Sequence, residues 1–401
     1  MSVANRYSRL LLLLALTLTT SGCVNQTIKS TTVPDVNTSA REVPEALLLD
    51  VGISIFDPGL DDADEDELVY PEVRRAEARY MPYILLESIQ SSAAWGAVRV
   101  IPSDQQVMDI VVAGTIVSSS GEELELKIIA RDARGEVWLD KGYRSKASKY
   151  SYGATTRARI DPFQAIYNRI ANDLLEQLLK RNTEELAAIR TVNELRFARS
   201  MSPDAFDGHL SEDGDGTYSI TRLPANNDPM LERVRKIRER DHLFIDTMQE
   251  YYSAFNGQMS APYQEWRKLS YTEAIALQEL RAEATRKLIT GAALVIAGIA
   301  AGASNDSSIN SASTVAILGG GSIFKSGMDA RTESEIHVQA LEELGLSLEA
   351  EIAPQIIELE DRTVTLTGNV QDQFDQWRDL LRQLYEAEVG ALEPLPTPVG
   401  S

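Results

Sequence analysis

Residues 109–143 read DIVVAGTIVSSSGEELELKIIARDARGEVWLDKGY, and this stretch decides the fold class. Three runs in it are rich in β-branched and apolar residues, as strands are, and two short polar segments separate them. The segments are Ser118–Gly121 and Asp132–Gly135, and Gly135 stands where a hairpin needs a left-handed residue. The stretch therefore predicts three antiparallel strands, at 109–117, 124–130 and 136–143.

Elements on either side of this stretch extend it into a domain. Apolar and polar residues alternate over 47–56, which predicts a half-buried strand, and 95–101 predicts a second strand. Between them, 71–91 has a helical pattern. Asp161 and Pro162 have the residue types that open a helix, with Asp161 as N-cap. The expected order over 46–180 is β-α-β-β-β-β-α.

The segments 109–117 and 124–138 resemble the periplasmic α/β domain of several envelope lipoproteins. These include the curli-secretion channel lipoprotein and the lipoprotein activators of penicillin-binding proteins. Their hairpin often reads apolar strand, Asp-x-x-Gly, then a strand with Trp, and Asp132, Gly135 and Trp138 match that order. The resemblance implies a role in binding and assembly within the cell envelope.

The N-terminus has the layout of a secretory signal peptide. Arg6 and Arg9 precede an apolar run, Leu10–Leu18, that is too short to span a bilayer as a helix. Small residues follow and end at Gly22, directly before Cys23. We therefore expect cleavage between Gly22 and Cys23.

The order Thr20-Ser21-Gly22-Cys23 resembles a bacterial lipobox, although that family prefers Leu where Thr20 stands. The resemblance implies that Cys23 is acylated and becomes the new N-terminus. Val24 stands where the family's sorting rules place Asp for inner-membrane retention, which implies the outer membrane, periplasmic face. The alternative is an ordinary secretory signal followed by an unrelated cysteine.

Composition narrows the classes of partner. The chain has 401 residues, a formal net charge of −21 and one cysteine. A protein with this large negative net charge will not bind nucleic acid through its overall electrostatic field, because that field repels the phosphates. With Cys23 used for lipid, no thiol remains for a disulfide or a thiolate metal site. The expected partners are the membrane, through the lipid anchor, and an envelope protein or cell-wall component, with a homo-oligomer possible.

The fold class is α+β: an N-terminal β-α-β-β-β-β-α domain, a long-helix domain with a Gly/Ala-rich apolar hairpin, and a small C-terminal strand-helix unit. The expected segments are 1–22 signal peptide, 23–45 lipidated tether, 46–180 α/β domain, 181–228 connecting helix and loop, 229–355 helical domain, 356–390 strand-helix unit and 391–401 disordered tail.

The helical domain is expected to begin with two antiparallel helices. Apolar residues recur at helical spacing over 229–256, and Asn256-Gly257 predicts a stop. Ser260 and Pro262 are typical of the next helix start.

The apolar hairpin 288–324 has two uncharged arms, 288–303 and 311–324. Its glycines are candidates for helix contact or oligomerisation, because small residues let helices approach closely. They are Gly291, Gly298, Gly302, Gly319, Gly320 and Gly321. Two interpretations remain open: a hairpin buried within the helical domain, or one that inserts into a membrane or forms oligomers.

We find no pattern that predicts catalysis or a metal site. His209, His242 and His337 share no metal-ligand spacing. If Gly216 is aligned with the glycine of an EF-hand calcium loop, the first and last ligand positions fall on Ser211 and Arg222, where that loop needs acidic residues. Basic clusters at 233–240 and at Arg74, Arg75 and Arg79 are interpreted as solvated helix faces. The sequence thus favours a non-enzymatic outer-membrane lipoprotein without a cofactor, acting as a binding or assembly component. The alternative is an oligomeric secretion or pore component that inserts 288–324.

Overall fold

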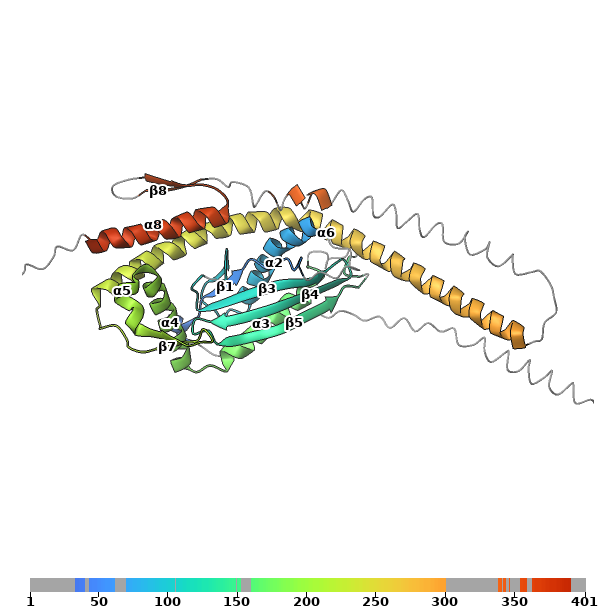
Figure 1. Cartoon of the computed structure of the whole chain (residues 1–401), viewed down its shortest axis with the longest axis horizontal. Helices are drawn as coiled ribbons and strands as arrows, with labels where there is room; N and C mark the ends of the chain where they lie inside the picture. The colour runs from blue at the N-terminus through green and yellow to red at the C-terminus, as the bar shows by residue number, and fades with distance from the viewer. Residues whose placement is uncertain are drawn as a thin grey trace, which may run out of the picture. The chain divides into compact units, whose positions relative to one another are not determined.

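The structure is a computed structural model. It describes residues 33–39, 43–61, 70–104, 106–148, 150–152, 160–300, 338–340, 342–343, 346, 354–358 and 363–390. All of these residues belong to one unit, Val33–Ser401. The fold is mixed α+β, with an N-terminal sheet domain followed by helices, which confirms the expected class (Figure 1).

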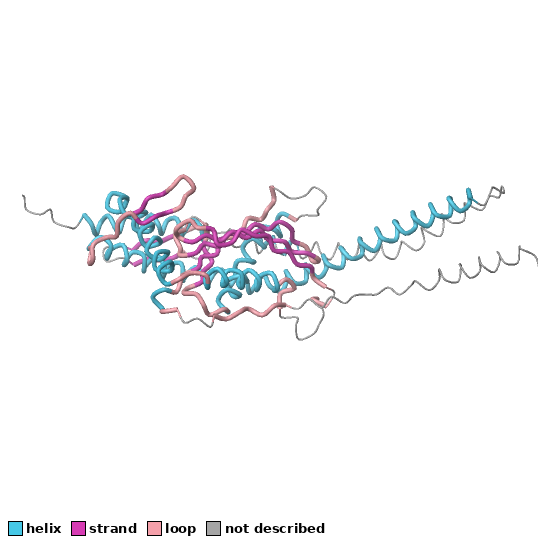
Figure 2. The backbone as a smooth tube through the Cα atoms, turned by 90° about the horizontal axis from the view of Figure 1, so that it is seen from below, coloured by secondary structure: helices cyan, strands magenta, loops and turns pink. Residues whose placement is uncertain are grey.

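The sheet domain is built on five strands in the order β2-β1-β3-β4-β5. They are β1 (Val51–Ser54), β2 (Val98–Ile101), β3 (Ile110–Ser119), β4 (Glu123–Asp132) and β5 (Val137–Lys146). β1 pairs in parallel with β2 and β3, while β3, β4 and β5 pair antiparallel through the two predicted turns. Figure 2 shows the strands lying side by side.

Two helices cover one face of this sheet. Helix α2 (Pro71–Ser91) contacts β1, β2 and β3, and helix α3 (Gln164–Leu179) contacts β5 and α2. Alternate residues of β3, such as Ile110 and Val112, are fully buried, whereas Val117 on the other phase is 45% exposed. α2 has the predicted ends. α3 starts later than expected, because the Asp161 carboxylate accepts from the Phe163 N–H at 2.8 Å and forms a turn first.

Shorter elements follow the sheet domain. Helix α4 (Thr183–Met201) starts with a capping box, in which Asn182 and Glu185 each accept from the other's backbone N–H. A small antiparallel hairpin lies within the segment that was expected to be a connecting loop. The remaining elements are η1 (Glu45–Leu47), α5 (Pro203–Phe206), η3 (Asp207–His209), β6 (Leu210–Glu212) and β7 (Tyr218–Ile220).

The expected antiparallel helix pair is wrong. One continuous helix, α6 (Pro229–Ala300), runs through both predicted breakpoints over 72 residues (Figure 1). A single buried stripe crosses them, because Phe255, Met259, Tyr263 and Trp266 are all at most 4% exposed and recur at helical spacing. Packing along this stripe outweighs the weak helix propensity of Gly257 and the missing N–H of Pro262.

The C-terminal unit packs against α6. Strands β8 (Gln355–Glu358) and β9 (Thr363–Leu366) pair antiparallel, and helix α8 (Val370–Gly390) follows. Phe244 of α6 stacks on Trp377 of α8 with ring centroids 4.8 Å apart. The predicted strand-helix unit is present, and β8 adds a second strand to it.

Only part of the apolar hairpin lies within the described residues. Residues 288–300 form the last turns of α6, and the second arm lies outside the described residues. Among the described helices, none has a stretch long and apolar enough to cross a membrane.

Candidate functional site: the buried junction between α6 and the sheet domain

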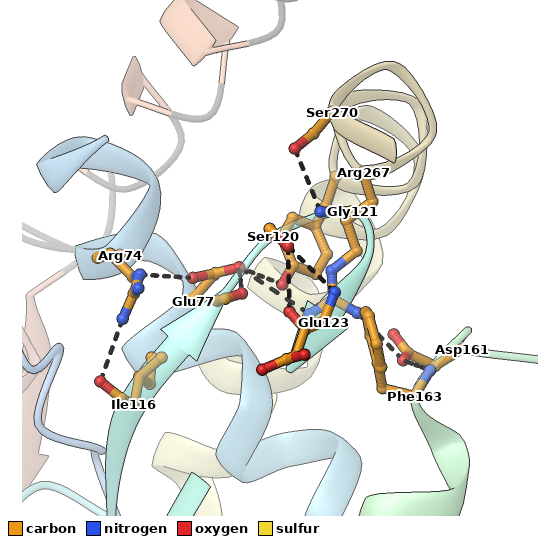
Figure 3. A network of polar contacts seen from close by, with 12 residues as sticks. Arg74, Glu77, Ile116, Ser120, Gly121, Glu123, Asp161, Phe163, Arg267 and Ser270 are labelled. Carbon is orange, nitrogen blue, oxygen red and sulfur yellow. Dashed lines mark hydrogen bonds and ion pairs between the residues drawn. The ribbon is translucent and has the colours of Figure 1, made fainter. Parts of the chain in front are cut away.

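Charged side chains lie buried where α6 meets α2 and the β3–β4 turn. Arg74 and Glu77 of α2 are 2% and 0% exposed, and Tyr263 and Arg267 of α6 are both 0% exposed. Figure 3 shows Arg74, Glu77 and Arg267 in the network of polar contacts at this junction. Burying charges is costly unless partners satisfy them, so each contact here matters to the fold.

Glu77 is the centre of this network. One carboxylate oxygen, Oε1, accepts hydrogen bonds from the Ser119 hydroxyl at 2.5 Å and from the Tyr263 hydroxyl. Arg74 lies 3.9 Å from the other oxygen, and Arg267 lies 3.9 Å from Oε1. Glu77 therefore joins α2, β3 and α6 through one buried carboxylate.

Arg267 is held from several sides. Its Nη1 lies 3.3 Å from a carboxylate oxygen of Asp161, just before α3. Its guanidinium also lies over the rings of Phe163 and Tyr263, at 4.5 and 4.2 Å from the centroids. Cation–π contacts of this kind strengthen when water is excluded.

Burial sets the protonation of the surrounding phenols. It raises the pKa of Tyr263 and Tyr167 well above the ordinary value, and raises the pKa of Tyr80 to about 12. Burial alone lowers the pKa of Arg267, but the neighbouring Tyr263 and Asp161 raise it to a net value well above the ordinary one. At neutral pH the phenols are neutral hydrogen-bond donors, and Arg267 is charged.

The β3–β4 turn approaches α6 so closely that only glycine fits. A Cβ on Gly121 would lie 2.0 Å from the Arg267 carbonyl oxygen and 2.2 Å from the Tyr271 nitrogen. The Gly121 N–H donates to the Ser270 hydroxyl at 3.2 Å. Any larger residue here would force the turn and α6 apart.

A second contact lies along the edge strand β2. The Gln249 side-chain amide of α6 accepts from the Val100 N–H at 2.8 Å and donates to the Val100 carbonyl at 2.9 Å. Arg99, also on β2, makes a bidentate salt bridge with Asp246, in which Nε and Nη2 donate to the two carboxylate oxygens at 2.6 and 3.0 Å. α6 thus supplies the hydrogen bonds that a neighbouring strand would give and covers an open edge.

A third contact lies at the opposite end of the sheet from Gly121. Asp109 is 1% exposed and accepts from the Asp50 N–H at 2.9 Å and from the Asn193 amide of α4 at 2.5 Å. Burial raises the pKa of Asp109, and these two hydrogen bonds oppose that shift. Arg235 of α6 in turn pairs with Glu194 of α4 at 2.6 Å.

His242 of α6 lies near this third contact. The pKa of His242 is lowered to about 4, first by burial and then by the positive charges of Arg238 and Arg99, which outweigh the opposing carboxylates of Asp50 and Asp246. The imidazole is therefore neutral at physiological pH.

Together, the three contacts fix α6 along the sheet domain.

Most of the predicted site residues are outside the described part of the chain. Gly22 and Cys23 are outside the described residues, as are Gly302, Gly319, Gly320 and Gly321. Gly291 and Gly298 both lie on α6. Residues seven apart on one helix share a face, and a role of this face in helix contact stays a prediction.

The basic clusters are not simply solvated, and that interpretation is wrong for two of their members. Arg74 is buried in the network around Glu77. Arg238 packs over the Phe197 ring at 6.0 Å and has its pKa lowered by burial. Arg74 of α2 and Arg238 of α6 therefore pack against neighbouring elements of the fold.

Two other candidates have structural roles. His209 is buried, with Nδ1 at 2.8 Å from the Arg222 carbonyl oxygen. In the 211–216 loop, the Asp213 carboxylate accepts from the backbone N–H groups of Asp215 and Thr217. Within the described ranges, no group of three or more histidine, cysteine, aspartate or glutamate side chains is placed to hold a metal ion.

The sequence reasoning missed the residues of the Glu77 network. One signal was available: Arg74 and Glu77 stand three apart within the apolar stripe of a helix whose ends were predicted well. A charged pair in the buried phase indicates a buried salt bridge. The partners Tyr263 and Arg267 carried no such signal, because they lie in a distant segment of the chain.

No protein-family model matches this chain, and no curated protein is significantly similar to it. The resemblance to envelope lipoproteins therefore stays a prediction.

Proposed function

We propose that this chain is an outer-membrane lipoprotein, anchored through acylated Cys23 and facing the periplasm, that serves as a non-enzymatic binding or assembly component of the cell envelope. The observation that carries the proposal is the single cysteine of the chain, which directly follows a basic, apolar and small-residue sequence at 6–22. Acyl chains would hold an acidic protein that has no electrostatic attraction to anionic lipid.

The arrangement of α6 supports an assembly role. Three separate contacts, at Glu77, Gln249 and Asp109, tie this helix or its neighbour α4 to the sheet domain. The charged groups there bind each other, and their chemistry is used in holding elements together.

One observation favours a second candidate, an oligomer that inserts 288–324 into a membrane. The first arm of that segment is helical through Ala300, and residues seven apart on a helix, as Gly291 and Gly298 are, share one face. Such a face permits close helix–helix approach.

Membrane fractionation with light scattering tests the proposal. The full-length protein and Cys23→Ser are expressed in a Gram-negative host, and detergent extracts are run by size exclusion. We expect the wild type in the outer-membrane fraction and Cys23→Ser in the soluble fraction. Identical fractionation of the two would refute the anchor. A large ring-sized particle would favour the oligomeric candidate, whereas an anchored monomer would favour the binding component.

A further inference from the structure

Strand β5 is an outermost strand of the five-stranded sheet (Figure 1). The Ala147 N–H donates to the Glu122 carbonyl at 2.7 Å, in the register that β4 and β5 share. In an antiparallel pair every second residue bonds to the neighbouring strand, so Asp140, Gly142 and Arg144 direct their backbone N–H and C=O groups outward. In the part of the chain that the structure describes, no strand pairs with this outward row. β5 therefore offers a template for another extended segment.

Helix α3 packs on one face of β5 and reaches the outward row at one point. On that face, the Tyr143 hydroxyl donates to the Asp173 carboxylate of α3 at 2.8 Å. At the row itself, Arg169 of α3 donates to the Arg144 carbonyl at 2.8 Å, and that oxygen keeps a second lone pair. Gly142 is exposed, and no described residue bonds to its outward N–H or C=O. The middle of the row is therefore open.

Gly142 is a second observation that indicates a partner at this edge. A Cβ on Gly142 would meet no atom within 4 Å, and its φ is not among the positive values of the chain. Neither packing nor backbone conformation within the described chain therefore requires a glycine here. A glycine inside a strand weakens that strand, and it often marks a place where another backbone approaches closely.

The exposed charges of β5 complement a second copy of the same strand. Asp140 and Arg144 have side chains that are 57% and 62% exposed, and each is two residues from Gly142. If two β5 strands pair antiparallel about a two-fold axis at Gly142, Asp140 of one copy faces Arg144 of the other. An axis at Asp140 or at Arg144 would instead bring two like charges face to face, which is unfavourable. The row therefore favours an axis at the uncharged Gly142.

The lysines of β5 are neutralised by acids of the same copy. Lysines on an edge strand usually oppose pairing with another strand. Here Lys141 pairs with Asp173 at 2.6 Å, and Lys146 pairs with Glu123 at 3.0 Å. These ion pairs reduce the repulsion that two basic edges would otherwise exert on each other.

We propose that a second copy of this chain pairs with β5, antiparallel and centred on Gly142, so that the two sheets become one continuous sheet. Asp140 and Arg144 of the two copies form two symmetric ion pairs, and backbone hydrogen bonds form in both directions around the axis. The inference goes beyond the function proposed above, because it requires neither acylation at Cys23 nor insertion of 288–324.

Cross-linking across the axis tests the geometry. The full chain is made with Cys23→Ser, so that an introduced cysteine is its only thiol. Residues that face each other in this way have Cα atoms about 5.5 Å apart, so a short bismaleimide should rapidly join Gly142→Cys to its copy. Gly257→Cys is the matched control, since Gly257 is also exposed and has open space around its Cβ, but lies on α6. The proposal is overturned if Gly142→Cys cross-links no faster than Gly257→Cys.

Sedimentation over a series of protein concentrations tests the ion pairs with variants that keep Gly142. The wild type should dimerise as its concentration rises. Asp140→Arg places like charges opposite each other and should raise the dimer dissociation constant about tenfold. Adding Arg144→Asp restores opposite charges and should return the constant to within about threefold of the wild-type value.

A wild type that stays monomeric at every concentration would overturn the proposal, as would an oligomer that Asp140→Arg leaves unchanged. The second result would be expected of an assembly held by 288–324 alone. Neither result depends on where the protein fractionates, so the anchor at Cys23 stands or falls separately.

Discussion

At the scale of single residues, the molecule pairs buried charges across long sequence distances. Arg267 joins Glu77, Asp161 and two aromatic rings without any exposed surface of its own. Removing one partner from such a network leaves the others buried and unpaired, which costs more than the net value of the interaction.

We predict that Arg267→Met lowers the free energy of unfolding by about 3–5 kcal/mol, because it removes one of the two cations beside the buried Glu77 carboxylate, the ion pair with Asp161 and two cation–π contacts. Urea denaturation measures this loss. Lys268→Met is the control: Lys268 is half exposed and pairs with exposed Glu265, so its change should stay within about 0.5 kcal/mol. Equal effects of the two variants would show that the network does not stabilise the fold.

His242 makes stability depend on pH in a defined direction. Its folded pKa of about 4 lies below the ordinary value of 6.5, so the unfolded chain binds the proton more tightly. Stability from this group is therefore present above pH 6.5 and is lost as the pH falls toward 4.

We predict that the wild type loses about 2 kcal/mol more than His242→Gln between pH 7 and pH 5, by urea denaturation at both values. Carboxylates titrate in both proteins, so the difference between the two isolates the histidine. If both proteins respond to pH alike, His242 is not held neutral by its surroundings.

At the scale of elements, the sheet was predictable and α6 was not. Runs of β-branched and apolar residues over 109–143 indicated the strands, and local turn chemistry indicated how they pair. At Gly257 and Pro262 the same local rules predicted a break. The stripe from Phe255 to Trp266 continues through that point, because it packs on distant elements that no local pattern reveals.

Gly257→Ala distinguishes one helix from two. In a continuous helix the added methyl meets open space and removes backbone freedom from the unfolded chain, so stability should rise by about 0.5–1 kcal/mol. A left-handed stop at Gly257 would instead make the substitution destabilising. Gly135→Ala provides the comparison: Gly135 has φ +88°, and its Cβ would lie 2.5 Å from the Gly216 carbonyl oxygen, so this variant should be less stable.

At the scale of the whole molecule, the candidate site was beyond sequence reasoning for a physical reason. Glu77 and Tyr263 lie 186 residues apart, and Arg99 and Asp246 lie 147 apart. Periodicity reports which face of an element is buried, but it does not report which distant element covers that face. The local pair of Arg74 and Glu77 could be seen in the sequence, whereas its distant partners Tyr263 and Arg267 could be identified only from the fold.

The whole molecule also combines two levels of attachment. α6 is fixed to the sheet domain by contacts that the structure describes, and the chain is proposed to be fixed to a membrane at Cys23. If both hold, any partner bound by the sheet domain or by α6 is kept near the outer membrane.

The most direct test is mass spectrometry of the N-terminal peptide of the protein purified from membranes of a Gram-negative host. We predict that the mature chain begins at Cys23, with a diacylglyceryl group on its sulfur and an acyl group on its α-amino nitrogen, and that residues 1–22 are absent. A peptide that contains unmodified Cys23, or a chain that begins at another residue, would contradict the proposed anchor.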